Sequence, residues 1–241
     1  MKITFVGTSH GVPEKDRFCT CIMIESGGAM YFVDAGAPMV DFMVNSGKDI
    51  NDLRAVFTTH VHSDHTIGLV HLVNLMNWYY KKSSAEIFIT EQEHIDVTAR
   101  WTYTAGDGEI DGSRIRFKVP AAGVVYKDEN ITVEYIPTAH IKNSYAILVT
   151  EGEKRVLFGG DLSHGLKKRD VPSVIKEDID GFVCELAHFT VDELCPYLEE
   201  CNAKRLFFIH AKPKRYADID SLRGRYKFEI VTPSDGDGFY V

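Results

Sequence analysis

Four residues that can bind metal lie within six positions of the chain: His60, His62, Asp64 and His65. Imidazole and carboxylate side chains are the ligands that hold Zn²⁺, Fe²⁺ or Mn²⁺ while leaving coordination positions open for chemistry. Three imidazoles packed together without a metal would repel one another at mildly acid pH. A histidine-rich surface loop is therefore the weaker interpretation, and the cluster predicts a metal centre.

The elements that must position this cluster can be predicted from the pattern of apolar residues. Apolar or alternating segments predict strands at residues 2–6, 20–25, 29–33, 54–58, 86–90, 115–119, 124–126, 131–136, 145–150, 155–158, 181–185, 205–209 and 227–231. Helical spacing predicts helices at residues 38–45, 66–80, 92–105 and 191–201, and one that begins near residue 216. Each half has strands first and helix–strand units later. This order favours an α+β fold of αββα type, with two packed sheets flanked by helices in a single domain over residues 1–241.

The composition limits the kind of protein that carries the cluster. The chain has 241 residues, a net charge of −8, 44% hydrophobic residues and 26% charged residues, which is ordinary for a globular protein. An acidic surface argues against broad binding to nucleic acid or to an anionic membrane. The five cysteines are irregularly spaced, and no apolar segment approaches 18 residues. We therefore expect reduced thiols in a cytoplasmic protein that does not span a membrane.

The segment around the cluster resembles a known signature. Residues 56–65, VFTTHVHSDH, are similar to the signature of the metallo-β-lactamase superfamily. The resemblance continues at the superfamily's other ligand positions, His140, Asp161 and His210, each of which follows an apolar, strand-like segment. It also includes Asp34, which matches an aspartate close behind the metal ligands. Strand ends are where sites are assembled in layered folds, so the residues by themselves agree with this assignment.

The resemblance implies a two-metal site and a set of ligands. One metal takes His60, His62 and His140, the other takes Asp64, His65 and His210, and Asp161 bridges both. His140 or His210 alone could equally be a core histidine, but the ordered set favours ligands. The implied cofactors are two divalent metal ions, with zinc expected and manganese or iron as alternatives.

Within the superfamily, the chain is most similar to ribonuclease Z and its phosphodiesterase relatives. The opening segment FVGTSHGVP at residues 5–13 and the segment KRY at residues 214–216 carry this similarity. Glu185 and His188 resemble a glutamate and a histidine taken as a proton-transfer pair in that branch. Asp161 comes only 21 positions after His140. The long arm that often grips transfer RNA in ribonuclease Z is therefore missing.

We accordingly expect a hydrolase that uses a hydroxide bound by two metals to cleave a phosphodiester. The expected catalytic residues are Asp64, which orients the hydroxide, and His188, which protonates the leaving oxygen with help from Glu185. The expected substrate is a small-molecule or short nucleotide phosphodiester. An extended nucleic acid or a membrane is not expected as a partner, and relatives suggest a homodimer.

Several alternatives stay open at the level of sequence. The same ligands would serve a hydrolase of a thioester, lactone or β-lactam, or a metal-binding sensor without turnover. A di-iron oxidoreductase would usually carry a flavin domain, for which this chain has no room. Glu185 could instead cap the following helix. The basic residues after Asp161 and His210 could favour a phosphate near the metals or, as is more usual, lie in solvated loops; they are Lys167, Lys168, Arg169, Lys212, Lys214 and Arg215. His10, His71 and His94 are expected to be structural or exposed. The aromatic residues at 78–80 and 101–103 could form a wall or lid over the cleft. Aromatic stripes of this type more often belong to the hydrophobic core.

Overall fold

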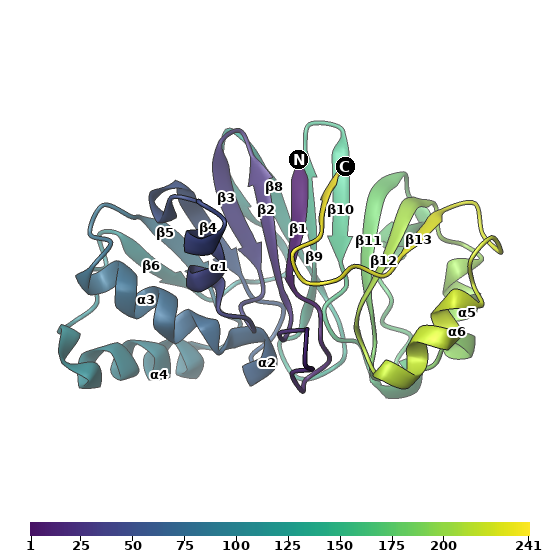
Figure 1. The fold of residues 1–241 in the computed structure, drawn as a ribbon, viewed down its shortest axis with the longest axis horizontal. Coiled ribbons are helices and arrows are strands. Elements are labelled where there is room, and N and C mark those ends of the chain that lie inside the picture. Colours follow the sequence, from purple (N-terminus) through teal and green to yellow (C-terminus); the bar gives the residue numbers. More distant parts are fainter.

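The computed structural model describes residues 1–241, with the exception of the side chain of Asp107. Two seven-stranded β-sheets pack against each other, and helices lie on the outer side of each sheet (Figure 1). This confirms the predicted αββα sandwich. In the part of the chain that is described, no helix is long and apolar enough to cross a membrane.

The first sheet comes mainly from the first half of the chain. Its strands, in spatial order, are β14 (Gly238–Tyr240), β1 (Lys2–Gly7), β2 (Cys21–Ser26), β3 (Ala29–Val33), β4 (Leu53–Phe57), β5 (Ala85–Phe88) and β6 (Ile115–Lys118). The helices of this half are α1 (Met39–Asn45), α2 (Ser63–Thr66), α3 (Gly68–Trp78) and α4 (Gln92–Thr102). Short helical turns occupy Ile50–Asp52 and Tyr103–Asp107.

The second sheet repeats this plan with the second half of the chain. Its strands, in spatial order, are β13 (Glu229–Val231), β12 (Ala203–Ala211), β11 (Ile179–Leu186), β10 (Lys154–Phe158), β9 (Tyr145–Glu151), β8 (Thr132–Pro137) and β7 (Gly123–Lys127). Its helices are α5 (Val191–Leu198) and α6 (Tyr216–Asp220), with short turns at His164–Leu166, Ser173–Lys176 and Pro213–Arg215.

Strand direction gathers several loops at one edge of the sandwich. In the first sheet β3 and β4 are parallel, and β1 runs the same way because β2 lies antiparallel between β1 and β3. In the second sheet β10, β11 and β12 are parallel, and β8 runs the same way as β10 because β9 lies antiparallel between them. Backbone hydrogen bonds join the two edges: Tyr145 N donates to Thr59 O at 2.9 Å, and His210 N donates to Thr8 O at 2.8 Å.

The inner faces of the sheets meet in a buried layer rich in aromatic side chains. Successive residues of a strand point to opposite faces, so Ile3 and Phe5 enter this layer while Val6 joins the core beneath the helices. Phe5 packs on Phe207 of the other sheet with ring centroids 5.4 Å apart. Burial of such rings removes much apolar surface from water, which stabilises the docking of the two sheets.

Three predicted helices end or break earlier than their spacing suggests. The helix predicted at 66–80 begins at Gly68 and ends at Trp78, and a separate turn of helix at Ser63–Thr66 precedes it. A β-carbon on Gly68 would lie 2.5 Å from Ala37 O, so this close approach requires glycine. The helix predicted at 92–105 gives way after Thr102 to a wider turn that Gly106 completes with a φ of 92°. The third, predicted at 191–201, ends at Leu198. Strand β14 was not predicted, since three residues carry too little pattern.

The aromatic residues at the ends of α3 and α4 are a second correction. Trp78, Tyr79, Trp101 and Tyr103 are between 47% and 62% exposed, so the interpretation of these residues as core is wrong. Helical spacing alone cannot distinguish an apolar stripe that faces a sheet from one that faces solvent.

Asp128, in the turn between β7 and β8, links the two sheets through polar contacts. Its carboxylate accepts hydrogen bonds from the hydroxyl of Tyr31 in β3 at 2.5 Å and from Tyr126 at 2.8 Å. It also accepts from the backbone N of Asn130 and of Ile131, both at 2.8 Å. Burial alone would raise the pKa of Asp128, but these hydrogen bonds outweigh it and lower the pKa below its ordinary value.

We predict that Asp128→Asn makes the free energy of unfolding less dependent on pH. A depressed carboxylate pKa stabilises the folded state above the pKa of the unfolded chain, and that contribution is lost as pH falls through the folded-state pKa. At pH 7 the variant should be less stable by about 1 kcal/mol, and the difference should shrink below about pH 4. Urea unfolding at pH 7 and at pH 3 measures this, with the exposed Asp16→Asn as control. An equal loss at both pH values would contradict the prediction.

Candidate metal centre

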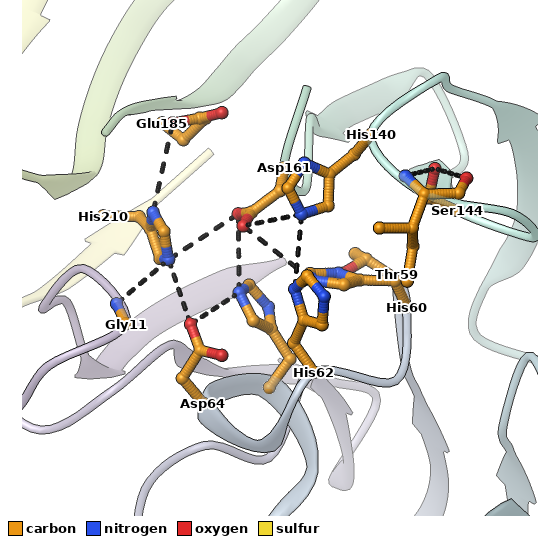
Figure 2. Close-up of polar contacts among 12 residues, drawn as sticks. Gly11, Thr59, His60, His62, Asp64, His140, Ser144, Asp161, Glu185 and His210 are labelled. Atoms are coloured by element: carbon orange, nitrogen blue, oxygen red, sulfur yellow. Dashed lines mark hydrogen bonds and ion pairs between the residues drawn. The ribbon is translucent and has the colours of Figure 1, made fainter. Parts of the chain in front are cut away.

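His60, His62 and His140 converge on one side of Asp161 and form, with it, the first half-site. His60 Nε2 lies 3.0 Å from His62 Nδ1, and His140 Nε2 lies 3.3 Å from the same His62 nitrogen. Asp161 Oδ2 faces this group, 3.8 Å from His60 Nε2 and 3.7 Å from His140 Nε2. Figure 2 shows these side chains pointing toward one another from loops of both sheets.

The other oxygen of Asp161 faces the second half-site, which it forms with Asp64, His65 and His210. Asp161 Oδ1 is 3.4 Å from His65 Nε2 and 3.7 Å from His210 Nε2. Asp64 Oδ2 is 3.4 Å from His65 Nε2 and 3.2 Å from His210 Nε2. One buried carboxylate therefore offers one oxygen to each group, which is the arrangement expected of a ligand that bridges two ions.

The chemistry of both half-sites fits divalent metal ions. In each, four potential ligand atoms all lie within 4.8 Å of one another. His65 Nε2 and Asp161 Oδ1 are buried and have no hydrogen-bond partner, although they face each other in the second half-site. A buried polar atom without a partner costs about 1–3 kcal/mol. A cation between these atoms would remove that cost, so the residues present fit the metals that the resemblance implies.

The electrostatics of the cluster favour the metal-binding protonation state at some ligand candidates and oppose it at others. Burial lowers the pKa of His60 well below its ordinary value, and the neighbouring His65 lowers it further. Burial alone would raise the pKa of Asp161, but His210 and His65 hold it well below the ordinary value. At neutral pH the imidazole of His60 is therefore neutral and the carboxylate of Asp161 ionised. These are the forms in which histidine and aspartate act as ligands. Burial alone would lower the pKa of His65 and of His210, but Asp161 outweighs it and raises both, so a metal at the second half-site would have to displace protons from these rings.

Asp34, in the loop after β3, holds the second half-site from behind. Its Oδ2 accepts a hydrogen bond from His65 Nδ1 at 2.8 Å, and its Oδ1 accepts one from Thr59 N at 2.7 Å. The first contact leaves His65 Nε2 to face Asp64 and Asp161, as is usual for a histidine ligand and its carboxylate partner. Asp34 has a φ of 59°, a strained value for a residue with a side chain, and such strain concentrates at functional sites.

Glu185 and His188 form a hydrogen-bonded pair beside the cluster. His188 Nδ1 lies 2.8 Å from Glu185 Oε1, and Glu185 Oε2 accepts from the backbone N of Ala187 at 2.7 Å and of His188 at 3.0 Å. Burial alone would lower the pKa of His188, but the bond to Glu185 outweighs it and raises the pKa. Thr190, not Glu185, caps helix α5. The interpretation of Glu185 as a cap of that helix is therefore wrong.

The site opens to solvent through a cavity of about 250 Å³. Metal-ligand candidates line its floor, and residues from three loops line its walls. Its lining residues are His10, Gly11, Val12, His62, Asp64, Asp161, Ala187, His188, His210 and Lys212. The exposed aromatic residues of α3 and α4 are not among them, so they form no lid over this cavity.

Comparison with known proteins assigns the chain to a family. The family model described as Anti-Pycsar protein Apyc1 matches residues 1–229. The chain belongs to the Anti-Pycsar protein Apyc1 family.

Among solved structures, the metallo-β-lactamase fold protein YhfI from Bacillus subtilis is similar with a TM-score of 0.79 and 18% identity, over 99% of each chain. Human tRNase Z, short form, is similar with a TM-score of 0.75 and 18% identity, over 100% of this chain and 99% of that one. The Apyc1-family chain thus has the metallo-β-lactamase fold.

Curated sequence relatives carry the name ribonuclease Z. The one from Methanocaldococcus jannaschii is 29% identical over 156 residues, which cover 64% of this chain and 49% of that protein. One from Pseudomonas putida is 43% identical over 153 residues, which cover 63% of this chain and 47% of that protein. The match therefore spans about half the length of these two relatives. It agrees with the predicted similarity to the ribonuclease Z branch.

The structure brings together every ligand candidate of this Apyc1-family chain, and it adds residues that the sequence did not mark. Asp170 accepts hydrogen bonds from the backbone N of Ala139 at 3.0 Å and of Ser163 at 2.9 Å. It thereby ties the loop that carries His140 to the loop that follows Asp161. His10 was expected to be structural or exposed, yet it lines the cavity. No local pattern identifies Asp170, and His10 lies in the segment at residues 5–13 that resembles ribonuclease Z, without a signal that places it in the cavity.

We predict that Asp34→Asn weakens metal binding in the second half-site. The amide places an N–H donor where His65 Nδ1 or Thr59 N now finds an acceptor, so His65 loses its fixed orientation. Loss of such a partner lowers metal affinity about 10- to 100-fold. Competition for zinc against a chromophoric chelator should show that one of the two zinc ions per chain is bound more weakly. The exposed Asp41→Asn serves as control. Two unchanged equivalents in Asp34→Asn would contradict the role given to Asp34.

Proposed function

We propose that the chain is a metal-dependent hydrolase that cleaves a phosphodiester bond. The observation that carries this proposal is the single buried carboxylate of Asp161, which lies between two groups of imidazole and carboxylate ligands and next to the Glu185–His188 pair. The name ribonuclease Z of the sequence relatives supports phosphodiester chemistry. Because the match covers about half of those proteins, the activity is our inference for this chain.

The proposed ligands divide between two ions. His60, His62 and His140 would hold one, Asp64, His65 and His210 would hold the other, and Asp161 would offer one oxygen to each. Two such ions would supply Lewis acids for a phosphate oxygen and a more acidic water as nucleophile. Imidazole and carboxylate donors suit zinc, manganese or iron, and we propose zinc.

His188 is placed to deliver a proton to the leaving oxygen of the substrate. It lines the cavity, and its Nδ1 is engaged by Glu185, so the Nε2 edge of the ring is available to the substrate. The raised pKa of His188 favours the protonated ring that a proton donor needs. Glu185 fixes the ring's orientation through three hydrogen bonds that involve residues 185–188.

The size of the cavity supports a small or short nucleotide phosphodiester as substrate. About 250 Å³ lies just below the usual range of about 300–1,000 Å³ for ligand sites. Asp161 follows His140 after two strands, β9 and β10, joined by a tight turn, so no arm extends from this interval to grip a folded RNA. We propose a diester that enters the cavity with its phosphate toward the metals.

We predict that the pure protein hydrolyses bis-p-nitrophenyl phosphate and contains about two metal ions per chain. Asp64→Ala should lose turnover by at least about 100-fold, because a ligand of the second half-site and its contact with His210 are removed. Release of p-nitrophenolate measures the rate, and elemental analysis of the same samples measures metal content.

A parallel assay with a thioester separates this proposal from carboxyl-ester chemistry. Two metals with thioester turnover and no diester turnover would contradict the proposed substrate class. Failure to bind metal, even after zinc and manganese are supplied, would overturn the metal site as well. The exposed Asp41→Ala serves as a control that should keep both activity and metal content.

We predict that the effect of His188→Ala depends on the leaving group. A p-nitrophenolate departs readily without a proton, whereas an unsubstituted phenolate, with a pKa of about 10, needs one. Loss of general acid catalysis typically costs about 10²–10⁴-fold. We expect this loss for a phenyl diester and a much smaller loss for the p-nitrophenyl diester, at unchanged metal content. Glu185→Gln should act in the same direction. Equal losses for both substrates would show that His188 is not the proton donor.

A further inference from the structure

A second histidine that faces a glutamate, His10, lines the same cavity as His188. His10 Nδ1 lies 3.2 Å from Glu14 Oε1, and the hydroxyl of Ser9 donates to that same oxygen at 3.2 Å. An ionised glutamate has no proton to donate, so the hydrogen of this contact lies on His10 Nδ1. The pair thus repeats the arrangement of His188 and Glu185, in which Nδ1 also faces a glutamate.

The orientation of His10 leaves its Nε2 edge for the cavity. His10 lines the cavity, whereas Glu14, which engages Nδ1, lies behind it and does not. The imidazole is 20% exposed, which is enough for contact with a ligand and too little for free rotation in solvent. A carboxylate that engages Nδ1 in this way fixes the orientation of the ring, as it does for histidines that bind metals or substrates.

The loop that carries His10 lies directly against the second half-site. Gly11 N lies 3.2 Å from His210 Nε2, and a β-carbon on Gly11 would be 3.6 Å from Asp64 Oδ2. Glu185 Oε2 lies 4.0 Å from the other ring nitrogen of His210, so the two loops approach opposite edges of this ring. Figure 2 shows Gly11 and Glu185 on either side of His210. His10 and His188 therefore belong to different walls of one cavity.

Lys212 adds a positive charge to the same cavity. It follows His210 by two residues just past the end of β12, is half-buried, and lines the cavity together with His10. A lysine ammonium held near a metal centre is a point-charge donor suited to phosphate oxygens. The carboxylates that line the cavity, Asp64 and Asp161, are the proposed metal ligands. Their charge would be taken up by the metals, which leaves Lys212 and His10 for the substrate.

We propose that His10, oriented by Glu14, and Lys212 form a binding subsite for the phosphate group of the substrate, on loops other than the one that carries His188. With Nδ1 facing Glu14, the Nε2 edge of His10 faces a non-bridging phosphate oxygen, whose negative charge favours a proton on that nitrogen, and Lys212 Nζ donates to another oxygen. His188 then serves the leaving oxygen alone. This subsite deepens the proposed function and rests on it.

The test measures inorganic phosphate binding and diester hydrolysis on the same metal-loaded proteins. His10→Ala should raise the dissociation constant of phosphate, and the KM for bis-p-nitrophenyl phosphate, about tenfold, since one hydrogen bond to a charged group is lost. Lys212→Ala should act in the same direction, and Glu14→Gln should produce a smaller change. The matched control is His71→Ala, because His71 also has a carboxylate neighbour, Asp41 at 3.8 Å, but does not line the cavity.

The outcomes separate this subsite from the proposed activity. Unchanged phosphate affinity in His10→Ala, at two metals per chain, would overturn the subsite even if the diester is hydrolysed. Weakened phosphate binding in His10→Ala would support it even if the wild-type protein fails to hydrolyse the diester, a result that would overturn only the proposed activity. Loss of one metal ion in His10→Ala would assign the loop to support of the second half-site and would also overturn the subsite.

Discussion

The structure depends on the meeting of two sheet edges, because neither sheet carries a complete set of the candidate metal ligands. His60, His62, Asp64 and His65 follow a strand of the first sheet, whereas His140 and Asp161 follow strands of the second and His210 lies near the end of another. Main-chain hydrogen bonds between Tyr145 and Thr59 and between His210 and Thr8 fix how the edges meet. The aromatic layer between the sheets supplies most of the driving force for docking, and these directional bonds set its register. The spacing of the donor atoms follows from that register.

Much of the fold could be predicted because its determinants are local. The segment at 53–57 is apolar and is followed at once by the histidine cluster, so strand and site are both visible in about ten residues. His210 was predicted because it comes at the end of a long apolar segment, and it lies one residue before the end of the buried strand β12. The family resemblance ordered these separate signals along the chain. The strand pattern alone does not state which strand ends share an edge, since that depends on β2 and β9 reversing the chain direction.

The rest depends on contacts between residues far apart in sequence, which no local pattern records. Asp170 matters because its carboxylate reaches backbone groups of two different loops. Gly36 matters because a β-carbon there would lie 1.7 Å from the carbonyl oxygen of Asp64, so the loop after β3 can approach the cluster only with glycine. His10 enters the cavity because the chain after β1 folds back onto His210. Each of these residues looks ordinary in the sequence and acquires its role only once the sheets have docked.

The division of each half-site between the two sheets has a mechanical consequence. A cation in the first half-site would tie His60 and His62 to His140, and a cation in the second would tie Asp64 and His65 to His210. Each ion would therefore act as a cross-link between halves of the chain that are otherwise joined at this edge by a few backbone hydrogen bonds. Part of the free energy of metal binding would then add to the free energy needed to separate the two sheets. Loss of the metal ions would weaken the contact between the two sheets at this edge first. The same ions would therefore determine both the reactivity of the site and the lifetime of the folded state.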